Sequence, residues 1–475
     1  MKKDFLPKLG VIINSIKAFN EEGKRRVEKK FLKLYEDLKK ECLISSDSIY
    51  HQERIFGPNE AYEIARKFGK EQVDVIIILN SAFPNGHVFT TIASDPYLLK
   101  IPIILTSDLE QNLGNREWTI NAWCGCIMNN FVAKQIERYV YLLGGDIGSK
   151  EYKEKLKKLL KIYNTISLLR KEFIGRFGDA PGGFHSATGN QLAYLMKFGV
   201  KVDTVDLTSV MYTYKTGIAK GYIKESKFDE KDIKETIKKM KLMVKTDVDD
   251  KCLEDGARLY HSFKAIIEAN GYTSAVFRCW PEIQSEIIPI TACLSITWLL
   301  TEGIVSSTSC ESDWPTSVAQ SIGTYLSGKP AACLDFVNYT GANEIVQLGH
   351  CGVGIAGCMA EDAKIAYHTV CRQSGTKMGP TLIGQFEYGI KTGINLIQTK
   401  QGKFKMLVFT GENSKETSKN MLYSAADIRV KDYKKLNELI IEHGFSHHLA
   451  VAFGDISEEL EELCKYYDIE YISLK

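Results

Sequence analysis

The first third of the chain alternates short apolar runs with longer stretches in which apolar and charged residues recur at helical spacing. The apolar runs, rich in Val, Ile and Leu, occupy residues 9–13, 73–79 and 101–106. The stretches at 24–40 and 127–143 have the pattern of helices. Apolar strands separated by helices are typical of a parallel sheet covered on both faces. The pattern predicts a doubly wound α/β domain over residues 1–168.

A lysine-rich helix at 150–161 leads into a second stretch with the same alternation. Strands are expected at 200–207 and 273–280, and helices at 227–245 and 287–300. These elements predict a second doubly wound domain over residues 169–330. A segment rich in Gly and Pro at 178–184 is either a tight turn or a loop that binds an anion through backbone N–H groups.

The last third changes character, because apolar and polar residues alternate with the period of strands. Such segments lie at 331–339, 345–350, 381–388 and 394–410, and the turn at 400–403 indicates a hairpin. A helix at 433–443, a strand at 448–453, a helix at 458–467 and a strand at 471–474 are expected to follow. The predicted fold is therefore α/β, with two Rossmann-like N-terminal domains and a β-rich α+β domain over residues 331–475.

The near-neutral charge balance excludes several classes of partner. Lys and Arg number 61 against 59 Asp and Glu, a formal net charge of +2. Such a balance removes the electrostatic argument for nucleic acid or an anionic membrane as the main partner.

The longest apolar run, 287–300, is too short to span a bilayer. The 12 cysteines are scattered without a CxxC pair, which is typical of small core side chains in a reducing compartment, so we expect a cytoplasmic protein.

Acidic and imidazole residues stand at the ends of apolar segments in the second half of the chain. They are Glu311, Asp335, His350, His447 and His448. Strand ends are where α/β folds place reacting groups, and carboxylates with imidazoles suit a divalent cation such as Mn²⁺. Each residue also has a structural explanation: Glu311 as a helix cap, Asp335 as the partner of an arginine, the histidines as core groups. The pattern alone therefore leaves a metal site open.

The arrangement of these residues resembles the L-fucose isomerase family. Glu311-Ser312-Asp313 is followed 24 residues later by Asp335, with Gly328-Lys329-Pro330 between them. His447-His448 with Gly454-Asp455 resembles that family's C-terminal ligand segment, and His350-Cys351-Gly352 looks like the extra histidine of the related L-arabinose isomerases. Arg278-Cys279-Trp280-Pro281 and Gly384-Gln385-Phe386 are typical of shorter members. The resemblance covers essentially the whole chain and is most specific from Arg278 onward.

The resemblance implies an aldose–ketose isomerase that works through an enediolate and uses Mn²⁺, with Co²⁺ or Mg²⁺ as alternatives. By similarity, Glu311, Asp335 and His448 are the metal ligands, and His350 is a fourth, as in the arabinose branch. Glu311 is then the catalytic base and Asp335 its partner. Adjacent residues of a strand point to opposite faces, so His447 is expected beside the metal site and not on the metal.

Residues expected to contact the sugar are Trp280, Arg278, His447 and Gln385. Phe83, Trp118 or Trp280 can form an aromatic wall. The family's sugars are L-fucose, D-arabinose, L-arabinose and sulfonated sugars such as sulfoquinovose. A sulfonate needs a cationic clamp, for which Arg116, Arg176, Lys215 and Arg278 are candidates.

The resemblance also implies a homotrimer or homohexamer whose pocket is completed by the N-terminal domain of a neighbouring subunit. Segments expected in that role are 80–87, 116–118 and Asn121. Two other readings stay open from the sequence. One is a non-catalytic sugar-binding or regulatory protein on the same scaffold, and the other is a metal-dependent aldolase or epimerase.

Overall fold

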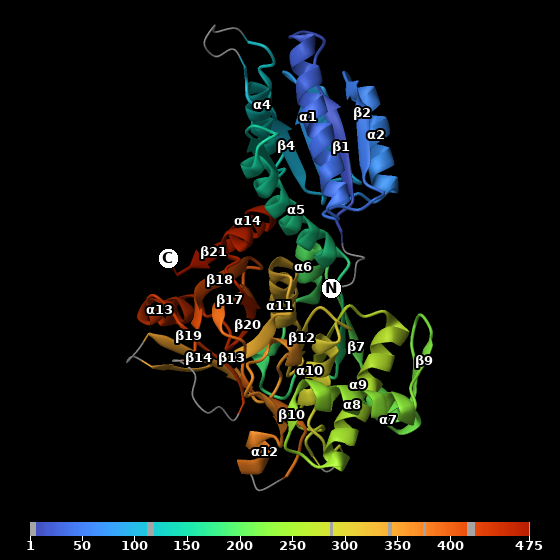
Figure 1. Cartoon of the computed structure of the whole chain (residues 1–475), viewed down its shortest axis with the longest axis vertical. Coiled ribbons are helices and arrows are strands. Elements are labelled where there is room, and N and C mark those ends of the chain that lie inside the picture. The colour runs from blue at the N-terminus through green and yellow to red at the C-terminus, as the bar shows by residue number, and fades with distance from the viewer. Residues whose placement is uncertain are drawn as a thin grey trace. The chain divides into compact units, whose positions relative to one another are not determined.

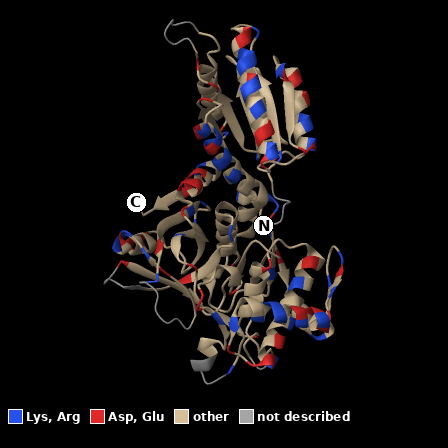
Figure 2. Cartoon of the chain, in the orientation of Figure 1, with Lys and Arg blue, Asp and Glu red and all other residues tan. Residues whose placement is uncertain are grey.

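A computed structural model describes residues 6–111, 118–285, 288–340, 344–373, 377–415 and 423–474 (Figure 1). The chain forms two compact units, Lys2–Leu168 and Leu169–Lys475. Charged side chains of both signs are spread over exposed helices of each unit, α1 and α8 among them (Figure 2). In the described part of the chain, no helix combines the length and the apolar character needed to cross a membrane.

The first unit is built on a parallel sheet with the strand order β2-β1-β3-β4-β5. The strands are β1 (Leu9–Asn14), β2 (Ile49–Ile55), β3 (Val75–Asn80), β4 (Ile103–Ser107) and β5 (Val140–Gly144). The helices are α1 (Glu21–Lys40), α2 (Pro58–Lys70), α3 (Gly86–Ser94), α4 (Ala122–Gln135) and α5 (Lys150–Arg170). Every residue of β1 and β3 is buried, as expected for a sheet covered on both faces.

The predicted helix at 127–143 is wrong in its second half. Helix α4 ends at Gln135, Glu137 adopts a left-handed backbone with φ of +53°, and Val140–Gly144 pairs with β4 as a strand. A five-residue apolar run has the same composition in a buried helix and in a buried strand, so periodicity could not separate the two.

The second unit contains a four-stranded parallel sheet with the order β12-β11-β6-β7. Its strands are β6 (Phe173–Phe177), β7 (Lys201–Val205), β11 (Ser274–Phe277) and β12 (Thr308–Cys310). Its helices are η1 (His185–Ala187), α6 (Gln191–Phe198), α7 (Leu207–Thr216), α8 (Glu230–Met243), α9 (Asp250–Asn270), α10 (Cys293–Thr301) and α11 (Trp314–Ser327), with a small hairpin β8 (Ile218–Lys220) and β9 (Glu225–Lys227). Helix α10 begins six residues later than the predicted 287–300 helix.

The same unit contains a mixed sheet with the order β10-β15-β16-β19-β14-β13-β20-β17-β18-β21. The strands are β10 (Lys245–Thr246), β13 (Ala332–Thr340), β14 (Ile345–His350), β15 (Lys364–Ala366), β16 (Thr381–Gln385), β17 (Gly389–Gln398), β18 (Phe404–Asn413), β19 (Ser424–Arg429), β20 (His448–Phe453) and β21 (Glu470–Ser473). The remaining helices are η2 (Ala356–Cys358), α12 (Thr369–Gln373), α13 (Tyr433–His443) and α14 (Ser457–Tyr467). Because β18 also pairs with β19, the strands from β19 through β20 to β18 close into a ring.

The α/β class, with parallel sheets and a β-rich mixed sheet, is confirmed. Phe277 of the parallel sheet and Leu334 of the mixed sheet belong to one hydrophobic core, so residues 169–330 and 331–475 pack as parts of one unit. This shared core brings the ends of the parallel strands against β13, β14 and β20.

Candidate active site

The candidate site begins at the C-terminal ends of the parallel strands. Glu311 follows β12, Trp280 follows β11 by three residues, and the 178–184 loop follows β6. Such strand ends are where open α/β sheets bind their ligands. The hydroxyl of Ser312 donates to the carbonyl of Gly178 at 2.7 Å and ties the ends of β12 and β6 together.

A tight turn between β12 and α11 carries the motif Glu311-Ser312-Asp313. Glu311 and Ser312 have left-handed backbones, with φ of +55° and +57°. Asp313 is the N-cap of α11, and its Oδ1 accepts from the amide of Thr316 at 2.9 Å. The turn aims both carboxylates at one imidazole: Oε2 of Glu311 lies 2.9 Å from Nε2 of His448, and Oδ2 of Asp313 lies 2.8 Å from its Nδ1.

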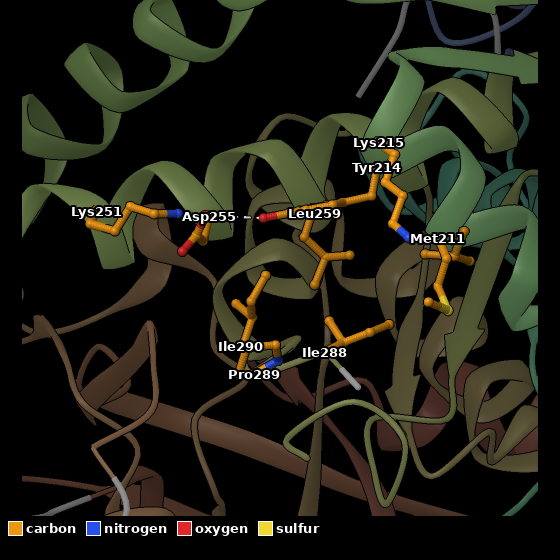
Figure 3. A pocket seen from close by; sticks show the side chains of 10 residues that line it. Met211, Tyr214, Lys215, Lys251, Asp255, Leu259, Ile288, Pro289 and Ile290 are labelled. Atoms are coloured by element: carbon orange, nitrogen blue, oxygen red, sulfur yellow. Dashed lines mark hydrogen bonds and ion pairs between the residues drawn. The ribbon is translucent and has the colours of Figure 1, made fainter. Parts of the chain in front are cut away.

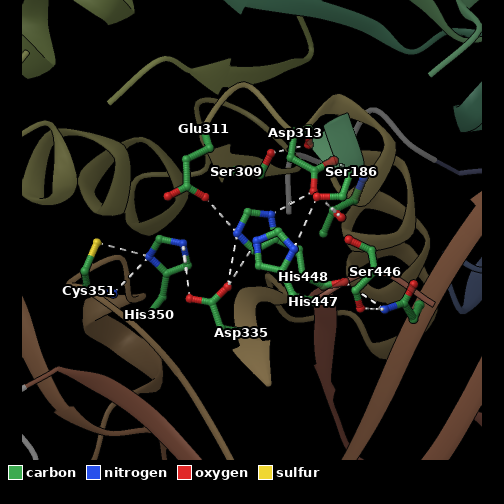
Figure 4. Close-up of polar contacts among 12 residues, drawn as sticks. Ser186, Ser309, Glu311, Asp313, Asp335, His350, Cys351, Ser446, His447 and His448 are labelled. Carbon is green, nitrogen blue, oxygen red and sulfur yellow. Dashed lines mark hydrogen bonds and ion pairs between the residues drawn. The ribbon is translucent and has the colours of Figure 1, made fainter. Parts of the chain in front are cut away.

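The mixed sheet supplies the opposite side of the cluster (Figure 4). Asp335 of β13 and His448 of β20 are direct partners in an antiparallel ladder, which puts their side chains on one face. Oδ1 of Asp335 lies 3.2 Å from Nε2 of His448. The His448 side chain is fully buried, whereas that of Asp335 is 32% exposed. The imidazole of His448 is therefore shielded from solvent, whereas the Asp335 carboxylate is accessible to it.

The two nitrogens of His448 have different environments. Nδ1 donates to the buried carboxylate of Asp313. Nε2 is close to Glu311 and Asp335 but forms no aligned hydrogen bond among the residues that the structure describes. One buried imidazole nitrogen therefore faces oxygens of two carboxylates, at 2.9 and 3.2 Å, without an aligned hydrogen bond to either. A divalent cation that takes nitrogen and oxygen ligands fits this set.

In this cluster, the carboxylates and the imidazoles shift one another's pKa values in opposition to the effect of burial. Burial alone would raise the pKa of Glu311, but His448 and His350 bring it below its usual value. Burial would likewise raise the pKa of Asp335, but the same two histidines lower it. Burial lowers the pKa of His448, yet Cys333 and the three surrounding carboxylates raise it well above its usual value. Opposite charges are thus held together in a low-dielectric site, where a cation can take the place of a proton.

His350, at the end of β14, is close to the cluster but is oriented differently. Its Nδ1 accepts from the backbone amide of Cys351 at 3.0 Å, and its Nε2 lies 4.0 Å from Oδ2 of Asp335. Burial lowers the pKa of His350, but Cys351, Asp335 and Glu311 raise it to about 9. Because Nδ1 accepts from the Cys351 amide, the proton of the neutral ring lies on Nε2. Since Asp335, His350 and His448 offer ligand atoms within 4.8 Å of one another, His350 can join a cation after losing that proton.

His447 does not point away from His448, contrary to the opposite-face expectation. The two rings stack with centroids 4.2 Å apart, and Nε2 of His447 lies 3.9 Å from Oδ1 of Asp335. The alternation rule does not apply because His447 precedes β20 and is not part of the ladder. Burial and the neighbouring His448 lower the pKa of His447. Its Nδ1 lies 3.3 Å from the hydroxyl of Ser186.

Trp280 contacts the cluster directly. Its indole N–H donates to Oε1 of Glu311 at 3.3 Å, and its ring meets that of Phe184 edge-on with centroids 5.2 Å apart. The indole therefore holds the Glu311 carboxylate while Phe184 and Trp280 form an aromatic wall. The 178–184 loop and η1 lie beside the cluster through Phe184 and Ser186.

Arg278 and Gln385, which were expected to contact the sugar, form hydrogen bonds with other residues of the protein. The Arg278 guanidinium donates to Glu282 through Nη2 at 2.9 Å and to the carbonyl of Ala180 through Nη1 at 2.8 Å, so it braces the 178–184 loop. Gln385 is buried and donates to Asp427 at 3.5 Å.

The expected sulfonate clamps are also dispersed. Arg176 pairs with Asp179. Lys215 lines a cavity of about 280 Å³ between α7 and α9, together with Tyr214 and Leu259 (Figure 3). Arg116 lies outside the described residues. Phe83, Trp118 and Asn121 belong to the Lys2–Leu168 unit.

The sequence reasoning missed Asp313, Phe184 and Ser186. Asp313 had a signal, because it is the second carboxylate of the motif that contains Glu311. Its buried contact with His448 joins residues 135 positions apart and depends on the packing of the two sheets. Phe184 and Ser186 had no signal beyond the composition of their loop.

Known proteins match this chain along most of its length. Residues 10–170 match the model of the fucose/sulfoquinovose isomerase N-terminal domain, and residues 358–475 match that of the L-fucose isomerase C-terminal domain. A sulfoquinovose isomerase of Alkalicoccus urumqiensis is 26% identical over 409 residues, which cover 85% of this chain and 86% of that protein. A sulfoquinovose isomerase of Priestia aryabhattai is 23% identical over 405 residues, covering 84% and 85%. One of Clostridium sp. (strain MSTE9) is 23% identical over 406 residues, covering 83% and 85%.

Proposed function

The chain belongs to the family of L-fucose and sulfoquinovose isomerases, so it is an isomerase, and we propose that it interconverts an aldose and a ketose at the Glu311–Asp335–His448 cluster. The observation that carries this proposal is that Nε2 of His448 lies 2.9 Å from the Glu311 carboxylate, which follows the parallel sheet, and 3.2 Å from that of Asp335 on the mixed sheet. A protein that merely binds sugars has no need for this costly set of buried charges.

Glu311, Asp335 and Nε2 of His448 would hold a divalent cation, with Mn²⁺ favoured and Co²⁺ or Mg²⁺ as alternatives. When bound, the cation supplies positive charge that stabilises the enediolate of the sugar. Asp313 keeps the proton of His448 on Nδ1 and thereby leaves Nε2 to the cation. His350 can be a fourth ligand only after it loses its Nε2 proton. While that proton is in place, the Nε2–H faces Asp335 and can donate to the substrate.

Proton transfer falls to the chain's own carboxylates. We assign Glu311 the role of the base that takes the C2 proton, with Asp335 as the partner on the other side, which returns a proton at C1; the roles reverse with the direction of the reaction. The indole N–H of Trp280 keeps one Glu311 oxygen fixed. His447 and Ser186 then border the sugar, while Trp280 and Phe184 cover its C–H face.

We propose a sulfonated aldose such as sulfoquinovose as the first substrate to test, because the relatives named above are sulfoquinovose isomerases. Arg278 and Arg176 already bind acidic side chains, so they do not form an obvious sulfonate clamp. The exposed Gly182 and Gly183 of the loop beside the cluster offer backbone N–H groups that suit an anion. L-Fucose, L-arabinose and D-arabinose are the uncharged alternatives.

The deciding experiment incubates chelator-treated protein with Mn²⁺ and each sugar in D₂O and follows the products by NMR. Ketose carrying one deuterium at C1 supports isomerisation through proton exchange. Shorter retro-aldol fragments, or a C2 epimer without ketose, would refute it. A preference for the sulfonated sugar that is lost when its sulfonate is replaced by hydroxyl would support the substrate class.

We further propose a homotrimer or homohexamer in which a neighbour's N-terminal domain covers the site. In one chain the Asp335 side chain is 32% exposed and that of His447 is 42% exposed, whereas an enediolate has to be shielded from water. Light scattering gives the assembly state. Mixing Asp335→Asn with His87→Ala, each inactive alone, should restore part of the activity in mixed oligomers. A fully active monomer would refute the assembly and leave the metal chemistry untouched.

A further inference from the structure

Two thiols and one imidazole converge next to the active-site cluster, although they are far apart in the sequence. Cys293, Cys351 and His368 each place a ligand atom within 4.8 Å of the other two. Cys293 is the first residue of α10, Cys351 follows β14 directly, and His368 immediately precedes α12. All 12 cysteines of the chain are free thiols, so neither sulfur is committed to a disulfide. This set shares no residue with Glu311, Asp335 and His448.

Two of the three side chains are fully buried, and Cys351 is partly buried. Cys293 is 0% exposed and His368 is 1% exposed. Nε2 of His368 has no hydrogen-bond partner among the residues that the structure describes. Its Nδ1 receives one long contact, from the amide of Cys371 at 3.3 Å. A buried imidazole nitrogen without a partner is rare and, beside two thiols, indicates a missing ligand.

We propose that Cys293, Cys351 and His368 form a second cation site, selective for a borderline or soft ion such as Zn²⁺. Two thiolates and one imidazole are a zinc-type ligand set, and they differ from the oxygen-rich set that suits Mn²⁺. In tetrahedral zinc sites the ligand atoms are about 3.5–3.8 Å apart, so these three, which lie within 4.8 Å of one another, would have to draw together by at most about 1 Å. Two thiol protons leave for solvent, the imidazole proton moves to Nδ1, and the long contact with Cys371 is given up. The fourth position is open to water.

The site has a consequence for the neighbouring cluster. Sγ of Cys351 lies 3.4 Å from Nδ1 of His350, so an ion on Cys351 would be bound to a sulfur that contacts the residue facing Asp335. The ion would also join three segments, the start of α10, the end of β14 and the start of α12. We therefore expect a structural role that fixes the backbone beneath His350, without a direct part in proton transfer.

The test uses Co²⁺ as a spectroscopic substitute for Zn²⁺ in the full-length, chelator-treated protein. A sulfur-to-cobalt charge-transfer band in the near ultraviolet is expected, because the carboxylate–imidazole cluster contains no sulfur ligand. The double variant Glu311→Gln, Asp335→Asn should keep the band, which separates this proposal from the proposed isomerase site. Cys293→Ala and Cys351→Ala should each lower its intensity by about half or more, their double variant should lose it, and His368→Asn should weaken Zn²⁺ binding at least about tenfold in competition with a chromophoric chelator.

Matched controls are Cys464→Ala, a buried thiol that contacts Met406, and Cys124→Ala, an exposed one; both should keep the band. X-ray absorption on the zinc-loaded wild type should give two sulfur and one imidazole ligand, and this result does not depend on how well any variant folds. Absence of a sulfur band in the wild type, or a band of undiminished intensity in the Cys293→Ala, Cys351→Ala double variant, would overturn the proposal.

Discussion

The carboxylate of Asp313 accepts a hydrogen bond from Nδ1 of His448 at 2.8 Å, and both side chains are fully buried. Asp313 simultaneously caps helix α11, so one side chain fixes the start of a helix and the orientation of an imidazole on another sheet. Carboxylate–histidine pairs of this kind set the ring tautomer and strengthen the opposite nitrogen as a metal ligand. The relationship makes Asp313 a residue that acts through His448.

Asp313→Asn should weaken Mn²⁺ binding by about 10–100-fold while leaving the fold intact. An asparagine can still cap α11, but it removes the negative charge that supports His448. Isothermal titration with Mn²⁺ measures the affinity, and circular dichroism checks the fold. Asp432→Asn is the matched control, because Asp432 caps α13 in the same way and is exposed. Equal Mn²⁺ affinity in wild type and Asp313→Asn would contradict the role.

Substitutions of Glu311 and Asp335 should differ in their effects on turnover and on metal affinity. Glu311→Gln is expected to lower kcat by about 10²–10⁴-fold with some metal binding retained, since an amide cannot accept the C2 proton. Asp335→Asn should lose metal affinity and turnover together, because it removes a charged ligand. Steady-state kinetics with parallel metal titrations distinguish the two. Glu387→Gln, at a carboxylate paired with Lys329, provides a control for the amide substitution. Full activity in either cluster variant would exclude the assigned roles.

Mn²⁺ should stabilise the folded protein. An ion present at 100 times its Kd contributes about 2.7 kcal/mol to folding stability, which a thermal melt detects. We expect a chelator to abolish activity and lower the Tm of the wild type, and added Mn²⁺ to restore both. The Tm shift should disappear in Asp335→Asn and persist in His350→Asn if His350 keeps its proton. A shift lost equally in both variants would instead make His350 a full ligand.

Lys391 should make stability depend on pH. Burial lowers its pKa to about 8 in the folded chain, from about 10.4 in an unfolded one. A lowered lysine pKa means that the charged form is disfavoured in the fold. The penalty is therefore complete below pH 8 and disappears as pH rises toward 10.4. Lys391→Met should raise stability at pH 7 by roughly 1–3 kcal/mol, with a smaller gain at pH 10.

Urea unfolding at both pH values measures this difference for Lys391→Met. Lys329→Met is the control, since Lys329 is half exposed and paired with Glu387. A gain of the same size at pH 7 and pH 10 would show that Lys391 acts through packing and not through its charge.

The sequence allowed the elements to be located better than the site. Continuous apolar runs identified β1, β3 and β4, and β20 and α13 were predicted at their observed bounds. The long helix α9 was missed because its buried face mixes Gly, Ala and Tyr among charged residues, which dilutes the periodicity.

The candidate cluster shows more clearly which features could not be predicted from the sequence. Glu311 and Asp335 could be named from their motif, but the contacts of His448 with both depend on how two sheets pack. The positions of His447, Asp313 and Cys293 depend on strand register and loop geometry, which no local pattern encodes. The scattered cysteines were predicted to be small core side chains. The convergence of Cys293, Cys351 and His368 beside His350 depends on how α10, β14 and α12 pack together.

The left-handed backbone of Glu311 has an evolutionary consequence. A residue with a Cβ pays roughly 1–2 kcal/mol for this conformation, whereas Gly adopts it freely and Asn more readily than most. The glutamate at position 311 thus stands against the preference of its own backbone, and burial of its carboxylate adds to the cost. Copies of the gene relieved of catalysis should drift toward Gly or Asn at this position and gain stability. On the proposed role of Glu311 as the base, homologous sequences with an acid at this position should be active, and those with Gly or Asn should not.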